Sequence, residues 1–156
     1  MPARRGSLRC IVKHRILVVD DSPIVVSTLS KILQEEGHEV ITAMNGVQGL
    51  KKARRMAPDL VILDIVMPIM DGFEMCQRLN ANPKTADIDV IFLSAMGNLD
   101  APNSGQFSKV LDVRSKAFDA GAIEFLGKPV AREDLIERVN FVLWAKRFGG
   151  DHGQED

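Results

Sequence analysis

The chain has 156 residues, with 20 Lys and Arg against 21 Asp and Glu, and its formal net charge is −1. This length suits one domain with a single core, and a composition of 46% hydrophobic and 26% charged residues is typical of globular proteins. The near-neutral charge disfavours a general nucleic-acid or membrane-surface binder, and no apolar run approaches the ~18 residues of a membrane span. Two cysteines, Cys10 and Cys76, are too few for a disulfide framework, so we expect a protein of the reducing cytoplasm.

The ends of the chain differ in character from the middle. Residues 1–14 are basic and lack periodicity, and residues 149–156 are polar and rich in glycine. We therefore expect a basic N-terminal extension over 1–14, one domain over 15–148 and a flexible tail over 149–156.

Five short apolar segments within this domain predict strands. Several are continuously apolar, which is typical of strands buried on both faces of a parallel sheet. In chain order they cover residues 16–19, 40–42, 60–63, 90–93 and 123–126.

Amphipathic stretches between these segments predict five helices. Ser22 and Pro23 are suited to the N-cap and first position of the first helix, and Gly37 is suited to its end. Strands that alternate with helices predict a single doubly wound α/β domain with a five-stranded parallel sheet and five flanking helices. The remaining helices are expected over 45–57, over 73–79, over a stretch that ends at Ala120, and over 132–148.

Polar side chains follow four of the predicted strands. Asp20 and Asp21 follow the first strand, Asp64 ends the third, Ser94 ends the fourth and Lys128 follows the fifth. The carboxyl ends of parallel strands share one edge of the sheet, so we expect these residues to lie together. Clustered carboxylates repel one another unless a cation joins them, and Mg²⁺ (or Mn²⁺) suits a site of few carboxylates, water and phosphate.

A divalent cation, a lysine, a hydroxyl and a carboxylate able to attack are the parts needed for phosphoryl transfer to an aspartate. Asp64 is the best candidate for the nucleophile because it ends the central strand. It lies between the acidic pair, Asp20 and Asp21, and the pair of Ser94 and Lys128.

An ordered set of motifs matches a known family. The set resembles the receiver domain of two-component response regulators over about residues 15–148. The resemblance implies a flavodoxin-like strand order of 2-1-3-4-5 and a phosphoacceptor signalling domain, not an enzyme acting on an external substrate. The motifs are Asp20-Asp21, Leu63-Asp64, Met67-Pro68, Met70-Asp71-Gly72, Ser94-Ala95 and Lys128-Pro129.

The resemblance also implies a role for each residue of the site. Asp64 would accept a phosphoryl group from a phosphohistidine of a sensor kinase. Mg²⁺ would be held by Asp20, Asp21, Asp64 and the backbone carbonyl of Val66. The phosphoryl oxygens would be bound by Ser94 and by Lys128, whose bond to Pro129 would be cis. Ser94 would move with a switch aromatic at Phe125.

Simpler interpretations exist for several of these residues. The acidic pair Asp20 and Asp21 could merely begin a helix, since Asp is a favoured N-cap. Ser94 could be a turn former at the end of a strand. Phe125 could be an ordinary half-buried strand residue.

The interval between Ser94 and Lys128 is long for the family. It exceeds the usual spacing by roughly a dozen residues, and the extra segment is expected within 99–112. We expect an extended region between the fourth strand and the fourth helix, with that helix beginning near Ser108. The insertion either gates the site and influences partner choice, or is simply tolerated.

The last predicted helix is apolar on two sides. One side carries a core stripe, and the other side carries aromatic residues that predict a surface for a partner or a second copy. Alternatively, the inserted segment or the tail covers this surface. The core stripe is Leu135, Ile136, Val139, Val142 and Leu143, and the opposite side is Phe141, Trp144 and Phe148.

Three functions compete at this stage. The first is a phosphorylation-controlled switch that receives its phosphoryl group from a histidine kinase or a phosphotransfer protein. It would act on a downstream protein target or on an output domain in a longer chain. The second is a phosphatase of the haloacid-dehalogenase type, which needs a second Asp where this chain has Val66. The third is a receiver-like scaffold or dimerisation module that works without phosphorylation.

Overall fold

The structure is a computed structural model that describes residues 12–95, 119 and 121–148. In this part of the chain five strands form one sheet in the order β2-β1-β3-β4-β5, and every neighbouring pair is parallel. The flavodoxin-like order that the family resemblance implies is therefore confirmed. The strands are β1 (Arg15–Val19), β2 (Glu39–Ala43), β3 (Leu60–Asp64), β4 (Asp89–Ser94) and β5 (Glu124–Gly127).

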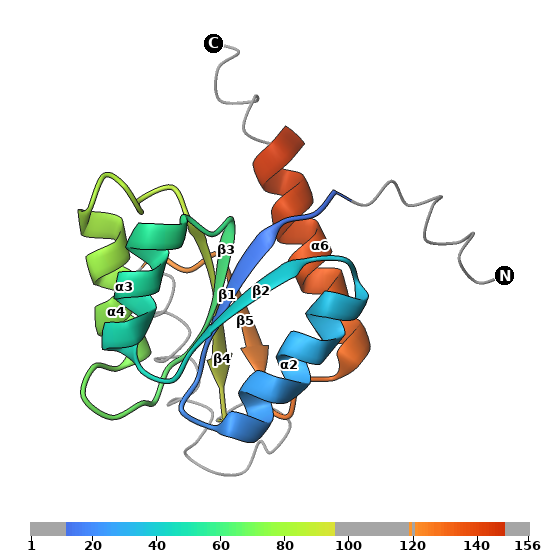
Figure 1. Cartoon of the computed structure of the whole chain (residues 1–156), viewed down its shortest axis with the longest axis horizontal. Helices are drawn as coiled ribbons and strands as arrows, with labels where there is room; N and C mark the ends of the chain where they lie inside the picture. Colours follow the sequence, from blue (N-terminus) through green and yellow to red (C-terminus); the bar gives the residue numbers. More distant parts are fainter. Residues whose placement is uncertain (1–11, 96–118, 120, 149–156) are drawn as a thin grey trace, which may run out of the picture.

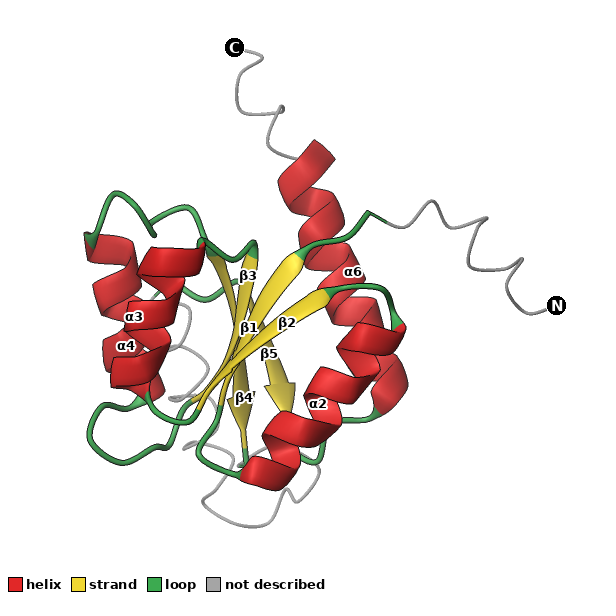
Figure 2. Cartoon of the chain, in the orientation of Figure 1, coloured by secondary structure: helices red, strands yellow, loops and turns green. Residues whose placement is uncertain are grey.

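Helices cover both faces of the sheet (Figures 1 and 2). The helices α3 (Gly46–Met56) and α4 (Gly72–Ala81) pack on one face. The helices α2 (Pro23–Glu35) and α6 (Arg132–Phe148) pack on the other. The sheet is thus the middle of three layers, as a doubly wound fold requires.

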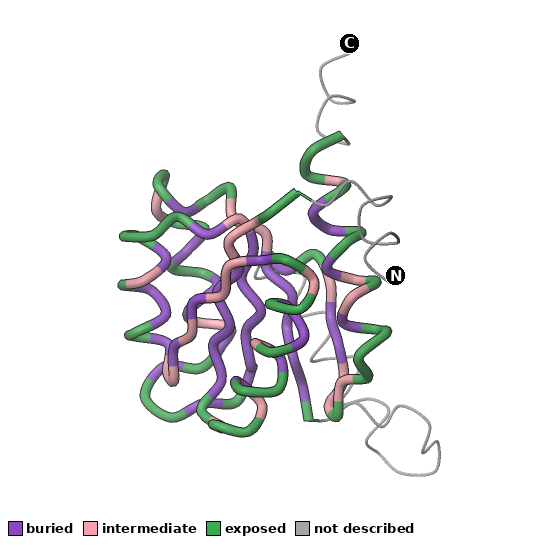
Figure 3. The backbone as a smooth tube through the Cα atoms, turned by 45° about the vertical axis from the view of Figure 1, so that its right-hand side comes forward, coloured by how far each residue is buried: buried purple, intermediate pink, exposed green. Residues whose placement is uncertain are grey.

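The apolar residues of β1 alternate between the two faces. Leu17 and Val19 join the core under α3 and α4, whereas Ile16 and Val18 join the core under α2 and α6. All five residues of β3 are buried, which explains why this strand is apolar until Asp64. Figure 3 shows buried backbone running through the sheet and exposed backbone on the outer sides of the helices.

Local capping interactions begin three of the helices. The Ser22 side chain accepts a hydrogen bond from the Val25 amide, and Pro23 follows it at the first helical position, as the sequence predicts. Asn45 and Asp71 cap α3 and α4 by accepting from amides three residues further on, both at 2.9 Å. Gly37 follows α2 with a φ of 94°, a conformation that favours glycine.

Four helices lie within the described part of the chain, where the sequence predicts five. The missing one is the helix expected from near Ser108 to Ala120, which lies outside the described residues except for Asp119. The expected insertion at 99–112, the tail at 149–156 and most of the N-terminal extension also lie outside them.

The glycine at the start of α4 brings that helix close to the end of β3. The Gly72 amide donates to the Ile65 carbonyl at 2.8 Å. A Cβ atom added at Gly72 would collide with the backbone oxygen of Asp64 and lie 2.9 Å from the Ile65 Cα. The contact is between backbones, so only glycine permits it, and it fixes the loop beside Asp64.

We predict that Gly72→Ala lowers the free energy of unfolding by about 1–3 kcal/mol, because backbone must move to admit the methyl group. Urea unfolding followed by circular dichroism measures this change. The control is Gln77→Ala on the exposed side of the same helix, which should change the free energy by less than about 0.5 kcal/mol. Equal stability of Gly72→Ala and the parent chain would contradict the close approach.

Candidate functional site

The register of the sheet brings the predicted site residues to one edge. Val19 pairs with Leu63, so Asp20 and Asp64, which follow them directly, lie at the same level on neighbouring strands. Ser94 pairs with Gly127, and the Lys128 amide then donates to the Ser94 carbonyl at 2.7 Å. Four of the predicted strand ends therefore meet at this edge, as expected from the fold.

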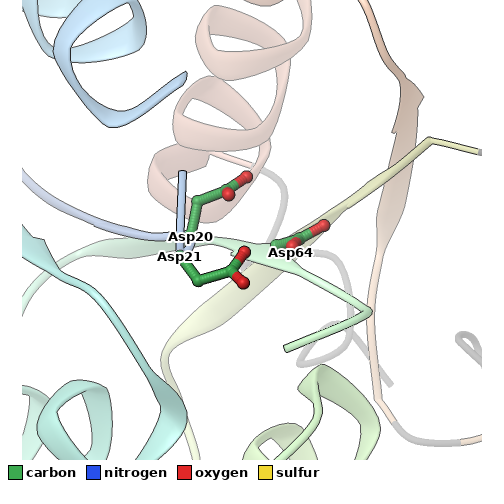
Figure 4. A group of neighbouring side chains, drawn as sticks. All are labelled: Asp20, Asp21 and Asp64. Carbon is green, nitrogen blue, oxygen red and sulfur yellow. The ribbon is translucent and has the colours of Figure 1, made fainter. Parts of the chain in front are cut away.

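Three carboxylates converge there (Figure 4). Asp20 and Asp21 come from the end of β1 and Asp64 from the end of β3, and one oxygen of each lies within 4.8 Å of the others. Asp20 and Asp64 are buried, with 0% and 4% of their surface exposed, whereas Asp21 is exposed. The Ser22 amide donates to Asp20 Oδ1 at 2.9 Å, which orients this carboxylate towards the cluster.

Lys128 balances part of this negative charge. Its Nζ lies 2.8 Å from Asp20 Oδ2 and 3.1 Å from Asp64 Oδ1, so one ammonium group bridges both buried carboxylates. The peptide bond between Lys128 and Pro129 is cis, as the family resemblance implies. Two buried acids facing one partly buried base leave a local excess of negative charge, to which exposed Asp21 adds.

The electrostatics of the cluster shift two pKa values. Burial, and then the charge of Asp20, raise the pKa of Asp64 from 3.8 to about 6, although Lys128 opposes the shift. Burial alone would lower the pKa of Lys128, but its hydrogen bonds and proximity to Asp20 and Asp64 raise it. Lys128 therefore stays charged at neutral pH, while Asp64 is a carboxylate whose ionisation is costly without a further cation.

The donor set fits a hard divalent cation. All three groups offer carboxylate oxygens, which are the ligands that Mg²⁺ and Mn²⁺ take in proteins, and their spacing allows one ion to contact them all. A cation would also relieve the repulsion that raises the pKa of Asp64. Val66, whose carbonyl is the expected backbone ligand, lies two residues beyond Asp64, and its side chain is 73% exposed.

The two predicted switch residues lie next to this cluster on β4 and β5. Ser94 is buried at the end of β4, one position beyond the residue that pairs with Asp64. Phe125 is 6% exposed and belongs to the core under α3 and α4, so it is buried and not half-buried. Both positions are compatible with the predicted switch.

Two features of the site region had no signal in the sequence. Arg138 on α6 donates to the Phe125 carbonyl at 3.3 Å and to Glu124 Oε1 at 2.8 Å, a contact across more than a dozen residues of sequence. Ile69, in the loop after Asp64, has a φ of 74° although a β-branched residue is disfavoured there. Ile69 is also 81% exposed, so packing does not compensate the strain.

The aromatic residues predicted as a partner surface are not part of this site. Phe141, Trp144 and Phe148 lie on α6 and are more than half exposed.

None of the helices in the described part of the chain has the length and apolar character needed to span a membrane.

The comparison with known proteins agrees with this geometry. The response regulator receiver domain family matches residues 16–140. The chain belongs to that family. It is 37% identical to Protein PilH of Pseudomonas aeruginosa over 129 residues, which cover 83% of this chain and 97% of PilH. A putative response regulator from Chloroflexus aurantiacus has a similar structure, with a TM-score of 0.73 and 30% identity over 85% of this chain and 98% of the other.

Some members of the receiver family that resemble this chain are longer. The chain is 36% identical to RpaA of Synechocystis, described as a DNA-binding dual master transcriptional regulator, over 83% of its own length. It spans about half of that relative, 48%. The chain is thus a response regulator receiver domain of two-component signalling.

We predict that Asp64→Asn stabilises the metal-free receiver at neutral pH. The folded state raises the pKa of Asp64 from 3.8 to about 6, so folding favours the protonated acid. The stability that the parent gains from this protonated acid is lost as the pH rises through these two values. The free energy of unfolding of the variant should exceed that of the parent by about 1–3 kcal/mol at pH 7, and the two should be nearly equal near pH 4. Urea unfolding in the presence of EDTA measures both values.

The control for this prediction is Asp71→Asn, which removes one negative charge from an exposed N-cap and keeps a residue able to cap. Its free energy of unfolding should equal that of the parent at both pH values. A gain in the stability of Asp64→Asn that is the same at pH 4 and pH 7 would contradict the assigned electrostatics.

Proposed function

We propose that this receiver is a phosphorylation-controlled switch in which Asp64 accepts a phosphoryl group from a phosphohistidine of a sensor kinase or phosphotransfer protein. The observation that carries the proposal is the geometry around Asp64. A buried carboxylate ends the central strand, with two further carboxylates within 4.8 Å and the Lys128 ammonium 3.1 Å from its Oδ1.

The chemistry follows from these groups. An Asp64 oxygen attacks phosphorus, the bond between phosphorus and the imidazole nitrogen of the donor breaks, and an acyl phosphate forms on Asp64. The attacking carboxylate must be ionised, and the raised pKa of Asp64 keeps much of it protonated below about pH 6 when no cation is bound. Lys128 is placed to neutralise charge on the transferred group.

The acidic pair has a separate task in this proposal. Asp20 and Asp21, together with Asp64 and the Val66 carbonyl, would hold Mg²⁺ or Mn²⁺. When bound, such an ion supplies positive charge to the phosphoryl oxygens. Asp20 also fixes the position of Lys128 through their 2.8 Å ion pair.

The proposed switch reaches the surface through β4 and β5. Ser94 would donate its hydroxyl to a phosphoryl oxygen, and a shift of Ser94 would change the packing of buried Phe125. Arg138 binds the Phe125 carbonyl, so such a change bears on α6. A downstream protein, or an output domain in a longer chain, would distinguish the two states in the cytoplasm, since a switch needs a partner with different affinity for each.

A phosphatase of the haloacid-dehalogenase type is disfavoured by Val66. That type of phosphatase needs an Asp two residues after the nucleophile, and a valine side chain carries no proton to donate.

We predict that a small phosphodonor such as phosphoramidate, with Mg²⁺, adds the mass of one phosphoryl group to the parent chain and none to Asp64→Asn. Lys128→Ala should slow the gain by about 100-fold, because it removes the positive charge nearest Asp64. Intact-mass spectrometry over time measures both effects, and omission of Mg²⁺ should abolish the gain in the parent.

The matched control is Asp71→Asn, which removes a carboxylate in the same loop region without touching the cluster and should be phosphorylated like the parent. A mass gain that persists in Asp64→Asn would show that another residue is the acceptor. Partner binding that is identical in phosphorylated and unphosphorylated chain would favour a scaffold instead.

A further inference from the structure

Two histidines lie together where β1 and β2 begin, at the end of the sheet opposite to the acidic cluster (Figure 1). His14 directly precedes β1 and His38 directly precedes β2. The parallel register pairs Arg15 with Glu39, so the two histidines are neighbours, and their ring centroids are 5.7 Å apart. The phosphotransfer chemistry proposed above uses neither histidine.

A hydrogen bond joins the two residues. The His14 amide donates to Nδ1 of the His38 ring at 3.2 Å, and the Glu39 amide donates to the His14 carbonyl at 2.9 Å. The His38 amide donates to the Leu33 carbonyl at 3.1 Å, in the last turn of α2. The His38 ring therefore ties the segment that enters β1 to the end of α2.

This hydrogen bond exists in only one protonation state of His38. A backbone amide nitrogen always donates, so Nδ1 must carry a lone pair and the proton of the neutral ring must lie on Nε2. Protonation of the ring places hydrogen on both nitrogen atoms, and two donors then face each other. A charged His38 cannot accept from the His14 amide.

The surroundings of His38 favour the neutral ring. His38 is 8% exposed, and burial, followed by the charge of His14, lowers its pKa from the ordinary value of 6.5. Two carboxylates oppose this shift, Glu36 after α2 and Asp59 before β3. At neutral pH the ring is therefore uncharged, and the bond from the His14 amide is made.

Other charged groups at this end of the sheet make contacts of their own. Arg15 Nε lies 3.3 Å from Glu39 Oε1, an ion pair between the first residues of β1 and β2. Asp59 Oδ2 accepts from the Arg15 amide at 2.9 Å. These contacts do not involve His38, so they keep β1 in the sheet when the bond to the His14 amide is lost.

We propose that His38 is a proton-operated latch for the segment that enters β1. The neutral ring holds residues 12–14 against the end of α2, and protonation of His38 releases them while the sheet stays intact. Val12 and Lys13 are exposed, so His14 is the point at which this segment is held. Through that anchor the latch sets where the basic N-terminal extension leaves the domain.

The latch is closed at neutral pH and opens in mild acid. The ordinary pKa of histidine is 6.5, and the lowered pKa of His38 in the folded chain means that folding favours the neutral ring. The stability that the neutral ring contributes is therefore present above about pH 6.5 and is lost as the pH falls from there through the folded pKa.

Nuclear magnetic resonance of the nitrogen-15-labelled full chain tests the latch over the range from about pH 8 to about pH 4.5. At the upper end, the ring signals of His38 should show the tautomer with its proton on Nε2. The His14 amide signal should then move with the same midpoint as the His38 ring, below pH 6.5. The protection of this amide against hydrogen exchange, relative to the intrinsic rate at each pH, should fall by about tenfold.

Three variants separate the acceptor from the charge. His38→Asn places an amide oxygen near the position of Nδ1 and has no titratable ring, so the His14 amide should stay protected across the range. His38→Leu removes the acceptor and should leave this amide equally unprotected at every pH. His14→Gln keeps the backbone amide but removes the neighbouring ring, and it should raise the midpoint of His38.

Asp64→Asn is the matched control, because it removes the carboxylate whose pKa of about 6 lies in the same range. The titration of His38 and the loss of protection at the His14 amide should be unchanged in this variant. The latch is therefore tested separately from the phosphotransfer proposed for Asp64. Circular dichroism at neutral pH checks that every variant is folded.

Three results would overturn the proposal. Protonation of His38 that leaves the His14 amide unchanged would mean that the titration does not break this bond. Protection of the amide in His38→Leu that equals that of the parent would mean that another group holds it. A loss of helical circular dichroism with the midpoint of His38 would mean that protonation unfolds the domain instead of releasing one segment.

Discussion

The structure is organised around one electrostatic constraint, which is that two buried carboxylates share a single, partly buried ammonium group. Lys128 lies 2.8 Å from Asp20 and 3.1 Å from Asp64, and burial makes any unbalanced charge there costly. The strand register, the close approach at Gly72 and the backbone bond between Lys128 and Ser94 all hold these groups together. The excess negative charge is what makes the site suited to a cation.

The same constraint links the site to the outer surface. The Ser94 carbonyl accepts a hydrogen bond from the Lys128 amide, which joins the end of β4 to the lysine of the cluster. Phe125 lies on the neighbouring strand, and Arg138 joins its carbonyl to α6. This helix begins near the acidic edge of the sheet and runs to the opposite end, so it spans the distance between the two.

Much of the fold and the cluster could be predicted because the signals are local. Continuous apolar runs predicted the strands, Ser22 and Pro23 predicted the start of α2, and the ends of parallel strands placed the acids beside Lys128. Contacts made only by tertiary packing could not be predicted. Arg138 reaches Phe125 across distant sequence, and the burial of Phe125 depends on helices from the other half of the chain.

The most direct test of the account is an amide NMR comparison of the full chain with and without beryllofluoride, a phosphoryl mimic, in the presence of Mg²⁺. The account predicts that signals move beyond the acidic cluster, at Ser94, Phe125 and Lys128 and along α6, and that Asp64→Asn abolishes every one of these shifts. Shifts confined to the residues next to Asp64, or shifts that persist in Asp64→Asn, would contradict it.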